Sequence, residues 1–278
     1  MSIKTILSVT GVNHREGDLR LAAGLCDQMA AHLSVLVVAI APPPPAGEFA
    51  AMVSDGWIQE RQEDQERLRE RESSVSAFLS GTGLSADVST GYPEEAWTDE
   101  TVGRRARYAD ITLIGPETLK SERLGPKVVE GSLFFSGRPV LLVPESVQPT
   151  LLPKRVMVAW DSRVEAARAV REAMDMIEGA EEVRVVLVDP AEGEDAHGAE
   201  PGADVAAYLA RHGAKVTVDR LPGADQPVAE VLRRHATDTA AELLVMGAYG
   251  HSRFRERIFG GVTRAMVERP SLPILMAR

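Results

Sequence analysis

An internal repeat restricts this chain to a small number of architectures. Residues 112–115 and 244–247 are each a short apolar run that ends in glycine, and residues 138–142 correspond in the same way to residues 272–276. Strands and helices that recur in one order indicate two domains with a common plan. Pro144 and Pro149 mark an interdomain linker, so we expect one domain over residues 1–150 and a second over residues 151–278.

Within each half, short apolar runs alternate with segments of helical spacing. Strands are predicted over residues 5–9, 33–40, 86–89, 111–114, 140–143, 155–160, 183–188, 215–218, 243–246 and 273–276. Helices are predicted over residues 18–31, 59–79, 94–107, 164–177, 203–211, 228–235 and 260–268. Asp18 is the expected N-cap of the first helix. Strands that alternate with helices need right-handed crossovers. The predicted fold class is therefore α/β, with two repeated five-stranded, mainly parallel sheets and helices on both faces, in a Rossmann-like arrangement.

Composition narrows the class of protein. Of the 278 residues, 44% are hydrophobic and 26% are charged, as in soluble globular proteins, so no membrane class is needed. The formal charge of −10 argues against a nucleic-acid surface, which needs concentrated Lys and Arg. The chain enters its first strand without an apolar stretch of signal-peptide length, and a cytoplasmic location is therefore expected.

Cysteine and histidine usage gives weak support for redox or metal chemistry. Cys26 is the single cysteine, so no intramolecular disulfide forms, and its apolar neighbours at helical spacing predict a buried position. The six histidines show no paired ligand spacing and no companion cysteines. The ligands of any metal ion stay unknown.

The segment over residues 243–263 carries the strongest functional signal. A buried strand ends at Gly247, Gly250 follows three residues later, and Gly260 and Gly261 precede a short helix. Glycine lets the backbone approach a ligand closely, and the free N–H groups of a helix start attract an anion. Turns also collect glycine, but open α/β sheets place their ligands at this carboxyl edge. The spacing therefore favours a phosphate site about as much as an ordinary turn.

The sequence resembles the universal stress protein family in its tandem form, over nearly the whole chain. The most specific match is the family pattern of glycine, two residues, glycine, nine residues and glycine, which Gly247, Gly250 and Gly260 follow. Val262 and Thr263 continue the match. The resemblance also implies that the two halves form an intramolecular pseudo-dimer, and two chains could associate further into a homodimer.

This resemblance implies a site for an adenine nucleotide, ATP or AMP, in the second half. Asp161 matches the acidic residue that follows the first strand in ATP-binding members, although an Asp here also commonly caps the next helix. Val188 matches the residue that contacts adenine, and Thr263 would add a hydroxyl donor to the phosphates, which Mg²⁺ normally accompanies. The expected nucleotide-binding residues are Asp161, Val188, Met246, Gly247, Gly250, Gly260, Gly261, Val262 and Thr263.

One departure from the family falls inside the motif. The hydroxyl residue expected directly after the third glycine is Gly261 in this chain. A lost neutral hydrogen bond is worth about 0.5–1.5 kcal/mol, which weakens a site without necessarily abolishing it. Weaker ATP binding, a preference for AMP and no nucleotide binding all stay open.

The first half departs further from the pattern. Thr10 and Gly11 stand where the acidic residue is expected, and Gly115 is followed by Pro-Glu-Thr in place of the second glycine of the motif. Glu117 brings negative charge toward any phosphate. We therefore expect the first half to be a degenerate, mainly structural domain.

No catalytic residue is predicted. His251 and Ser252 lie in the glycine loop, but no partnered base or third orienting residue is recognisable, so a loop surface is favoured. Tyr249 either shields a ligand or covers the loop. Three alternating arginines either clamp phosphates or form a solvated patch, and they are Arg253, Arg255 and Arg257.

Two functions from different classes follow. The first is a stress-response protein that binds ATP or AMP in its second half and signals through its conformation or a protein partner. Slow ATP hydrolysis is the most enzymatic activity that the resemblance implies. The second is a nucleotide-independent interaction module, in which the glycine loop is purely structural.

Overall fold

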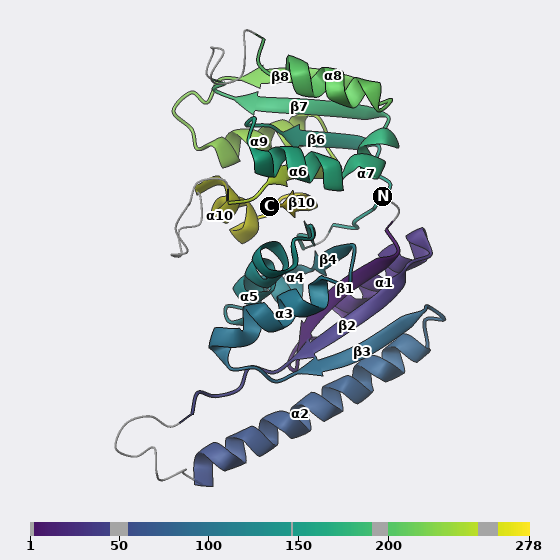
Figure 1. Ribbon diagram of the computed structural model, residues 1–278, viewed down its shortest axis with the longest axis vertical. Helices are drawn as coiled ribbons and strands as arrows, with labels where there is room; N and C mark the ends of the chain where they lie inside the picture. The colour runs from purple at the N-terminus through teal and green to yellow at the C-terminus, as the bar shows by residue number, and fades with distance from the viewer. Residues whose placement is uncertain (1–2, 45–54, 146, 191–199, 250–260) are drawn as a thin grey trace. The chain divides into compact units, whose positions relative to one another are not determined.

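The computed structural model describes residues 3–44, 55–145, 147–190, 200–249 and 261–278. Contacts between Cα atoms divide the chain into two compact units, residues 3–138 and residues 139–278 (Figure 1). Among the described residues, no helix combines the length and the apolar character needed to cross a bilayer.

The first unit is built on a parallel sheet of four strands in the order β3-β2-β1-β4. The strands are β1 (Thr5–Gly11), β2 (His32–Val38), β3 (Ala86–Gly91) and β4 (Ile111–Ile114). The helices are α1 (Gly17–Met29), α2 (Asp55–Ser80), α3 (Thr98–Ala106), α4 (Pro116–Lys120) and α5 (Leu124–Glu130), with a 3-10 turn η2 (Glu95–Trp97) and a π-helical segment η3 (Gly131–Ser136). Figure 1 shows the long helix α2 running alongside β3.

The second unit has six strands in the order β8-β7-β6-β9-β10-β5. They are β5 (Val140–Leu142), β6 (Arg155–Ala159), β7 (Glu182–Val188), β8 (Val216–Leu221), β9 (Leu243–Gly247) and β10 (Ile274–Ala277). All neighbours pair in parallel except β5 and β10, which are antiparallel with Leu141 opposite Leu275. The helices are α6 (Val164–Glu172), α7 (Met174–Glu178), α8 (Ala203–Arg211), α9 (Val228–Asp238) and α10 (Gly261–Glu268).

The crossovers place helices on both faces of each sheet. In the second unit the chain moves outward from β6 to β8 and then returns to β9 and β10, so right-handed connections put α6 and α8 on one face and α9 and α10 on the other. Nδ1 of His212, the residue directly after α8, lies 3.3 Å from Oε1 of Glu178 in α7. Arg233 of α9 donates to the carbonyl of Arg269, after α10, at 3.0 Å. Strands covered on both faces are apolar throughout, and Leu243, Leu244 and Val245 are fully buried.

The predicted α/β class with a repeated, mainly parallel sheet is confirmed. Five strands precede residue 150 and five follow it among the described residues, and the first four of each half share the order third-second-first-fourth. Cys26 is buried as expected. Contacts group β5 with the second unit, so the division between the compact units falls after Arg138.

Two local expectations were wrong. Asp18 does not cap α1: it lies in the first turn of α1, and its carboxylate accepts hydrogen bonds from the backbone of α4. The segment after β4 also contains two short helices that the sequence did not predict, α4 and α5. Such short helices depend on partners supplied by tertiary contacts, which local sequence does not specify.

Candidate functional site

A cavity of about 550 Å³ opens at the carboxyl ends of the strands in the second unit. This volume lies in the range of roughly 300–1,000 Å³ that small-molecule sites occupy. The cavity lies where β6 and β9 are neighbours, which is the point where the strand order reverses. Its lining comprises Ala159, Trp160, Asp161, Arg163, Glu165, Val186, Val188, Pro227, Val228, Ala229, Leu232, Met246, Gly247, Gly261, Val262, Thr263 and Ala265.

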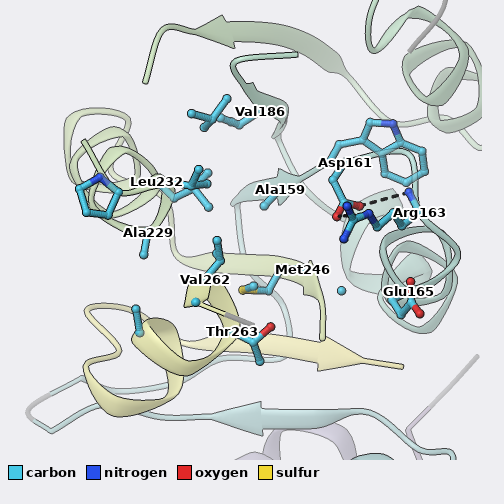
Figure 2. A pocket seen from close by; sticks show the side chains of 17 residues that line it. Ala159, Asp161, Arg163, Glu165, Val186, Ala229, Leu232, Met246, Val262 and Thr263 are labelled. Carbon is cyan, nitrogen blue, oxygen red and sulfur yellow. Dashed lines mark hydrogen bonds and ion pairs between the residues drawn. The ribbon is translucent and has the colours of Figure 1, made fainter. Parts of the chain in front are cut away.

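The cavity has an apolar side and a polar side (Figure 2). Val186 at the end of β7 and Ala229 and Leu232 in the first turns of α9 supply the apolar side. Asp161 after β6 and Thr263 in the first turn of α10 supply carboxylate and hydroxyl oxygens. A flat apolar group can therefore pack on one side while polar groups of the same ligand meet the other.

Asp161 has an exposed carboxylate and does not cap helix α6, which follows it. Its Oδ1 accepts the backbone N–H of Arg163 at 3.2 Å, and its Oδ2 lies 3.7 Å from the Nε of Arg163. The N-cap position of α6 is Arg163, with no side-chain capping bond. Asp161 thus stabilises the loop before α6, and 58% of its side chain stays accessible.

Gly247 has a structural role that is independent of any ligand. A Cβ at this position would lie 2.6 Å from the backbone nitrogen of Ala166 and 2.7 Å from the carbonyl carbon of Glu165. Helix α6 therefore begins directly against the end of β9, and only glycine permits this approach. The first glycine of the motif is explained by packing alone.

The hydroxyl of Thr263 is engaged with the backbone at the end of β9. Its Oγ1 accepts the N–H of Tyr249 at 3.3 Å, and Thr263 is only 6% exposed. Tyr249 is buried and has a φ of 63°, in the left-handed region that non-glycine residues rarely adopt. The bond from Tyr249 to Thr263 thus connects the end of β9 to the start of α10.

Gly261 leaves open space at the first position of α10. Gly261 is the first residue of α10, and no heavy atom of the described residues lies within 4 Å of a Cβ built on it. Val262 and Thr263 follow it on the cavity lining. The first residues of α10 therefore bring backbone N–H groups to the cavity, where an anion is favoured.

The structure brings together seven of the nine residues predicted for nucleotide binding. The seven that line the cavity are Asp161, Val188, Met246, Gly247, Gly261, Val262 and Thr263. Gly250 and Gly260 lie outside the described residues, and so do His251, Ser252 and the three loop arginines. Figure 2 shows Asp161, Met246 and Thr263 around one cavity although they come from three separate elements.

Sequence reasoning missed the contribution of helix α9. Pro227, Val228, Ala229 and Leu232 all line the cavity. The fold topology could have predicted these residues, because a helix that follows the third strand of a doubly wound sheet begins at the carboxyl edge of the sheet, on the face opposite α6. Arg163 and Glu165 were missed for the related reason that the start of α6 borders the same edge.

Nothing in the described parts of the chain groups three or more His, Cys, Asp or Glu side chains as a metal site would require. The charged residues that line the described cavity are Asp161, Arg163 and Glu165. Two carboxylates and one guanidinium leave a small negative excess, so any phosphate must be held mainly by backbone N–H groups or by further cations.

Comparison with known proteins gives a family match over the second part of the chain. Residues 153–278, which contain the whole cavity, match the universal stress protein family. Over 70 residues the chain is 37% identical to a universal stress protein of Synechocystis sp. strain PCC 6803, and this match spans 25% of the chain and 23% of that protein.

Solved structures share the fold over nearly the whole chain. A universal stress protein from Archaeoglobus fulgidus DSM 4304 is similar over 99% of this chain and 96% of its own, with a TM-score of 0.70 and 19% identity. A protein of Pseudomonas aeruginosa UCBPP-PA14, described as a universal stress protein, is similar over 99% and 93%, with a TM-score of 0.57 and 15% identity. Residues 153–278 therefore match the universal stress protein family, and the chain as a whole shares the two-part fold of these solved structures.

Proposed function

We propose that the second unit binds an adenine nucleotide, ATP or AMP, and that the protein acts in a stress response by conformational or partner signalling. The observation that carries this proposal is the cavity at the ends of β6 and β9, with its apolar and polar sides. The adenine ring packs against Val186, Ala229 and Leu232, and the carboxylate of Asp161 accepts a hydrogen bond from the ribose.

The phosphates point toward the start of α10. Gly261 and Val262 supply N–H groups that α10 itself does not use, because the first turn of a helix has no intrahelical acceptors for them. Glu165 and Asp161 place negative charge on the described lining. This favours AMP, or a triphosphate whose charge Mg²⁺ neutralises, over free ATP.

Isothermal titration of the full chain with ATP and AMP, each with and without Mg²⁺, tests the proposal. We expect one site per chain, and we expect Asp161→Ala to weaken binding. Asp204→Ala is the matched control, because Asp204 is an exposed carboxylate in the first turn of α8 and does not line the cavity. If millimolar nucleotide produces neither binding heat nor a thermal shift, nucleotide binding is disproved.

A nucleotide-independent interaction module is the second candidate. It is favoured by the structural roles of Gly247 and Thr263, since packing and a backbone hydrogen bond account for both without a ligand. Gly250→Val separates the two functions. If this variant loses nucleotide affinity but keeps partner binding and the stress phenotype, the interaction module is the correct function.

A further inference from the structure

The first unit repeats the close approach of helix and strand that precedes the cavity in the second unit. Leu7 and Thr112 are register partners, as are Met157 and Leu244, so Gly115 and Gly247 occupy equivalent positions at the carboxyl ends of β4 and β9. A Cβ on Gly115 would lie 2.3 Å from Oδ1 of Asp18, the second residue of α1. In both units a glycine thus lets the helix start against the end of the fourth strand.

In the first unit, carboxylates join the two helix starts reciprocally. Asp18 of α1 accepts the N–H groups of Glu117 and Thr118 of α4 at 3.0 and 2.8 Å. Glu117 of α4 in turn accepts the N–H groups of Arg15 and Gly17, at the start of α1, at 2.7 and 3.1 Å. Each helix therefore supplies the anion that the N-terminus of the other requires.

Arg71 adds a buried cation beside this arrangement. The guanidinium of Arg71, which α2 supplies, donates to the carbonyl of Arg15 at 2.6 Å and lies 3.4 Å from the hydroxyl of Thr10. Only 9% of Arg71 is exposed, and its Nε has no hydrogen-bond partner among the described residues. Burial lowers the pKa of Arg71, while the carboxylates of Glu117 and Glu16 act in the opposite direction.

We propose that the start of α1 is an oxyanion-binding site whose resident ligand is the carboxylate of Glu117. The two converging N–H groups of Arg15 and Gly17 are donors of the kind that recognise a phosphoryl or sulfate oxygen, and the buried charge of Arg71 adds a positive potential beside them. Glu117 is only partly buried, so the position is open to solvent. The equivalent residue of the second unit is Tyr249, which carries no carboxylate.

The position of Glu117 means that the first unit does not bind free anions readily at this helix start. Because Glu117 belongs to the chain, it competes with free anions at a high effective concentration, and the first unit is permanently occupied. The inference does not rest on nucleotide binding by the second unit. It concerns a different helix start and a different ligand class, inorganic oxyanions.

Removal of the resident carboxylate tests the proposal directly. We expect full-length Glu117→Ala to bind sulfate, measured by titration calorimetry, at least about tenfold more tightly than the unmodified chain. We also expect sulfate to raise its unfolding temperature saturably by about 2 °C or more relative to sodium chloride of equal ionic strength. Glu122→Ala is the matched control, because Glu122 is an exposed carboxylate just after α4.

A second variant covers the case in which Glu117→Ala does not fold. Glu117→Gln keeps one carbonyl oxygen as an acceptor, so it should fold and bind sulfate with an affinity between those of the alanine variant and the unmodified chain. A folded variant at position 117 that binds sulfate no more tightly than the unmodified chain overturns the proposal. An equal gain in Glu122→Ala does so as well, because the effect would then be one of net charge.

Discussion

Restoring a hydroxyl at position 261 is expected to strengthen nucleotide binding. The chain has Gly261 where the family pattern carries a hydroxyl residue, directly at the start of α10. The structure has room for the change, since no heavy atom of the described residues lies within 4 Å of the added Cβ.

The size of the effect follows from the chemistry of one added donor. A neutral hydrogen bond contributes about 0.5–1.5 kcal/mol to binding, and a bond to a charged group about 1.5–3 kcal/mol. A tenfold change in affinity corresponds to about 1.4 kcal/mol. Gly261→Ser should therefore lower the Kd for ATP or AMP by about two- to tenfold, with a larger gain only if the hydroxyl meets a fully desolvated phosphate oxygen.

The control for this prediction is Gly261→Ala. Alanine adds the same Cβ and removes the same backbone freedom, but it has no hydroxyl. Titration calorimetry on all three chains gives the Kd values, and thermal unfolding without nucleotide detects any stabilisation of the start of α10, where serine also acts as a capping residue. Equal nucleotide affinities for folded serine and alanine variants would refute the hydroxyl argument.

Three further predictions concern packing, pH and reactivity. Gly247→Ala should lower the free energy of unfolding, measured by denaturant titration, by about 1–3 kcal/mol because the added Cβ meets the backbone of α6. Gly24→Ala is the control and should not destabilise the chain, because no heavy atom of the described residues lies within 4 Å of its added Cβ. Burial lowers the pKa of His14 from 6.5, so the folded chain binds fewer protons than the unfolded chain near this pH. The free energy of unfolding should therefore fall as the pH drops through 6.5, and an equal fall in the His14→Gln variant would contradict this. Burial raises the pKa of Cys26 to about 12, and the thiol should react with disulfide reagents only after unfolding, so rapid labelling of the native chain would argue against the buried position.

Much of the architecture was predictable because it depends on local apolar runs. The central strands are covered on both faces, so runs such as residues 243–246 stand out from the helical spacing around them. A doubly wound order places the ends of the first and fourth strands of a half side by side, and β6 and β9 are indeed neighbours. The expectation that Asp161 and Gly247 border one site rests on that general rule.

The remaining parts of the site depend on contacts between distant residues. The lining contributed by α9 shows no motif, since Ala229 and Leu232 read as an ordinary apolar stripe. The role of Asp18 was misjudged because an Asp at a helix start usually caps that helix, whereas here it lies 99 and 100 residues before the N–H groups that it accepts. No local pattern specifies such a pair.

By itself, the sequence determined that this chain is a repeated α/β protein with a glycine motif in its second half, because periodicity and glycine spacing are local properties. Only the tertiary structure decided why the motif residues are there. Gly247 accommodates the backbone of α6, Thr263 binds the backbone of Tyr249, and the cavity forms because strand ends and helix starts converge on one edge. Only the tertiary structure also shows that, in the first half, the carboxylate of Glu117 accepts the N–H groups at the start of α1.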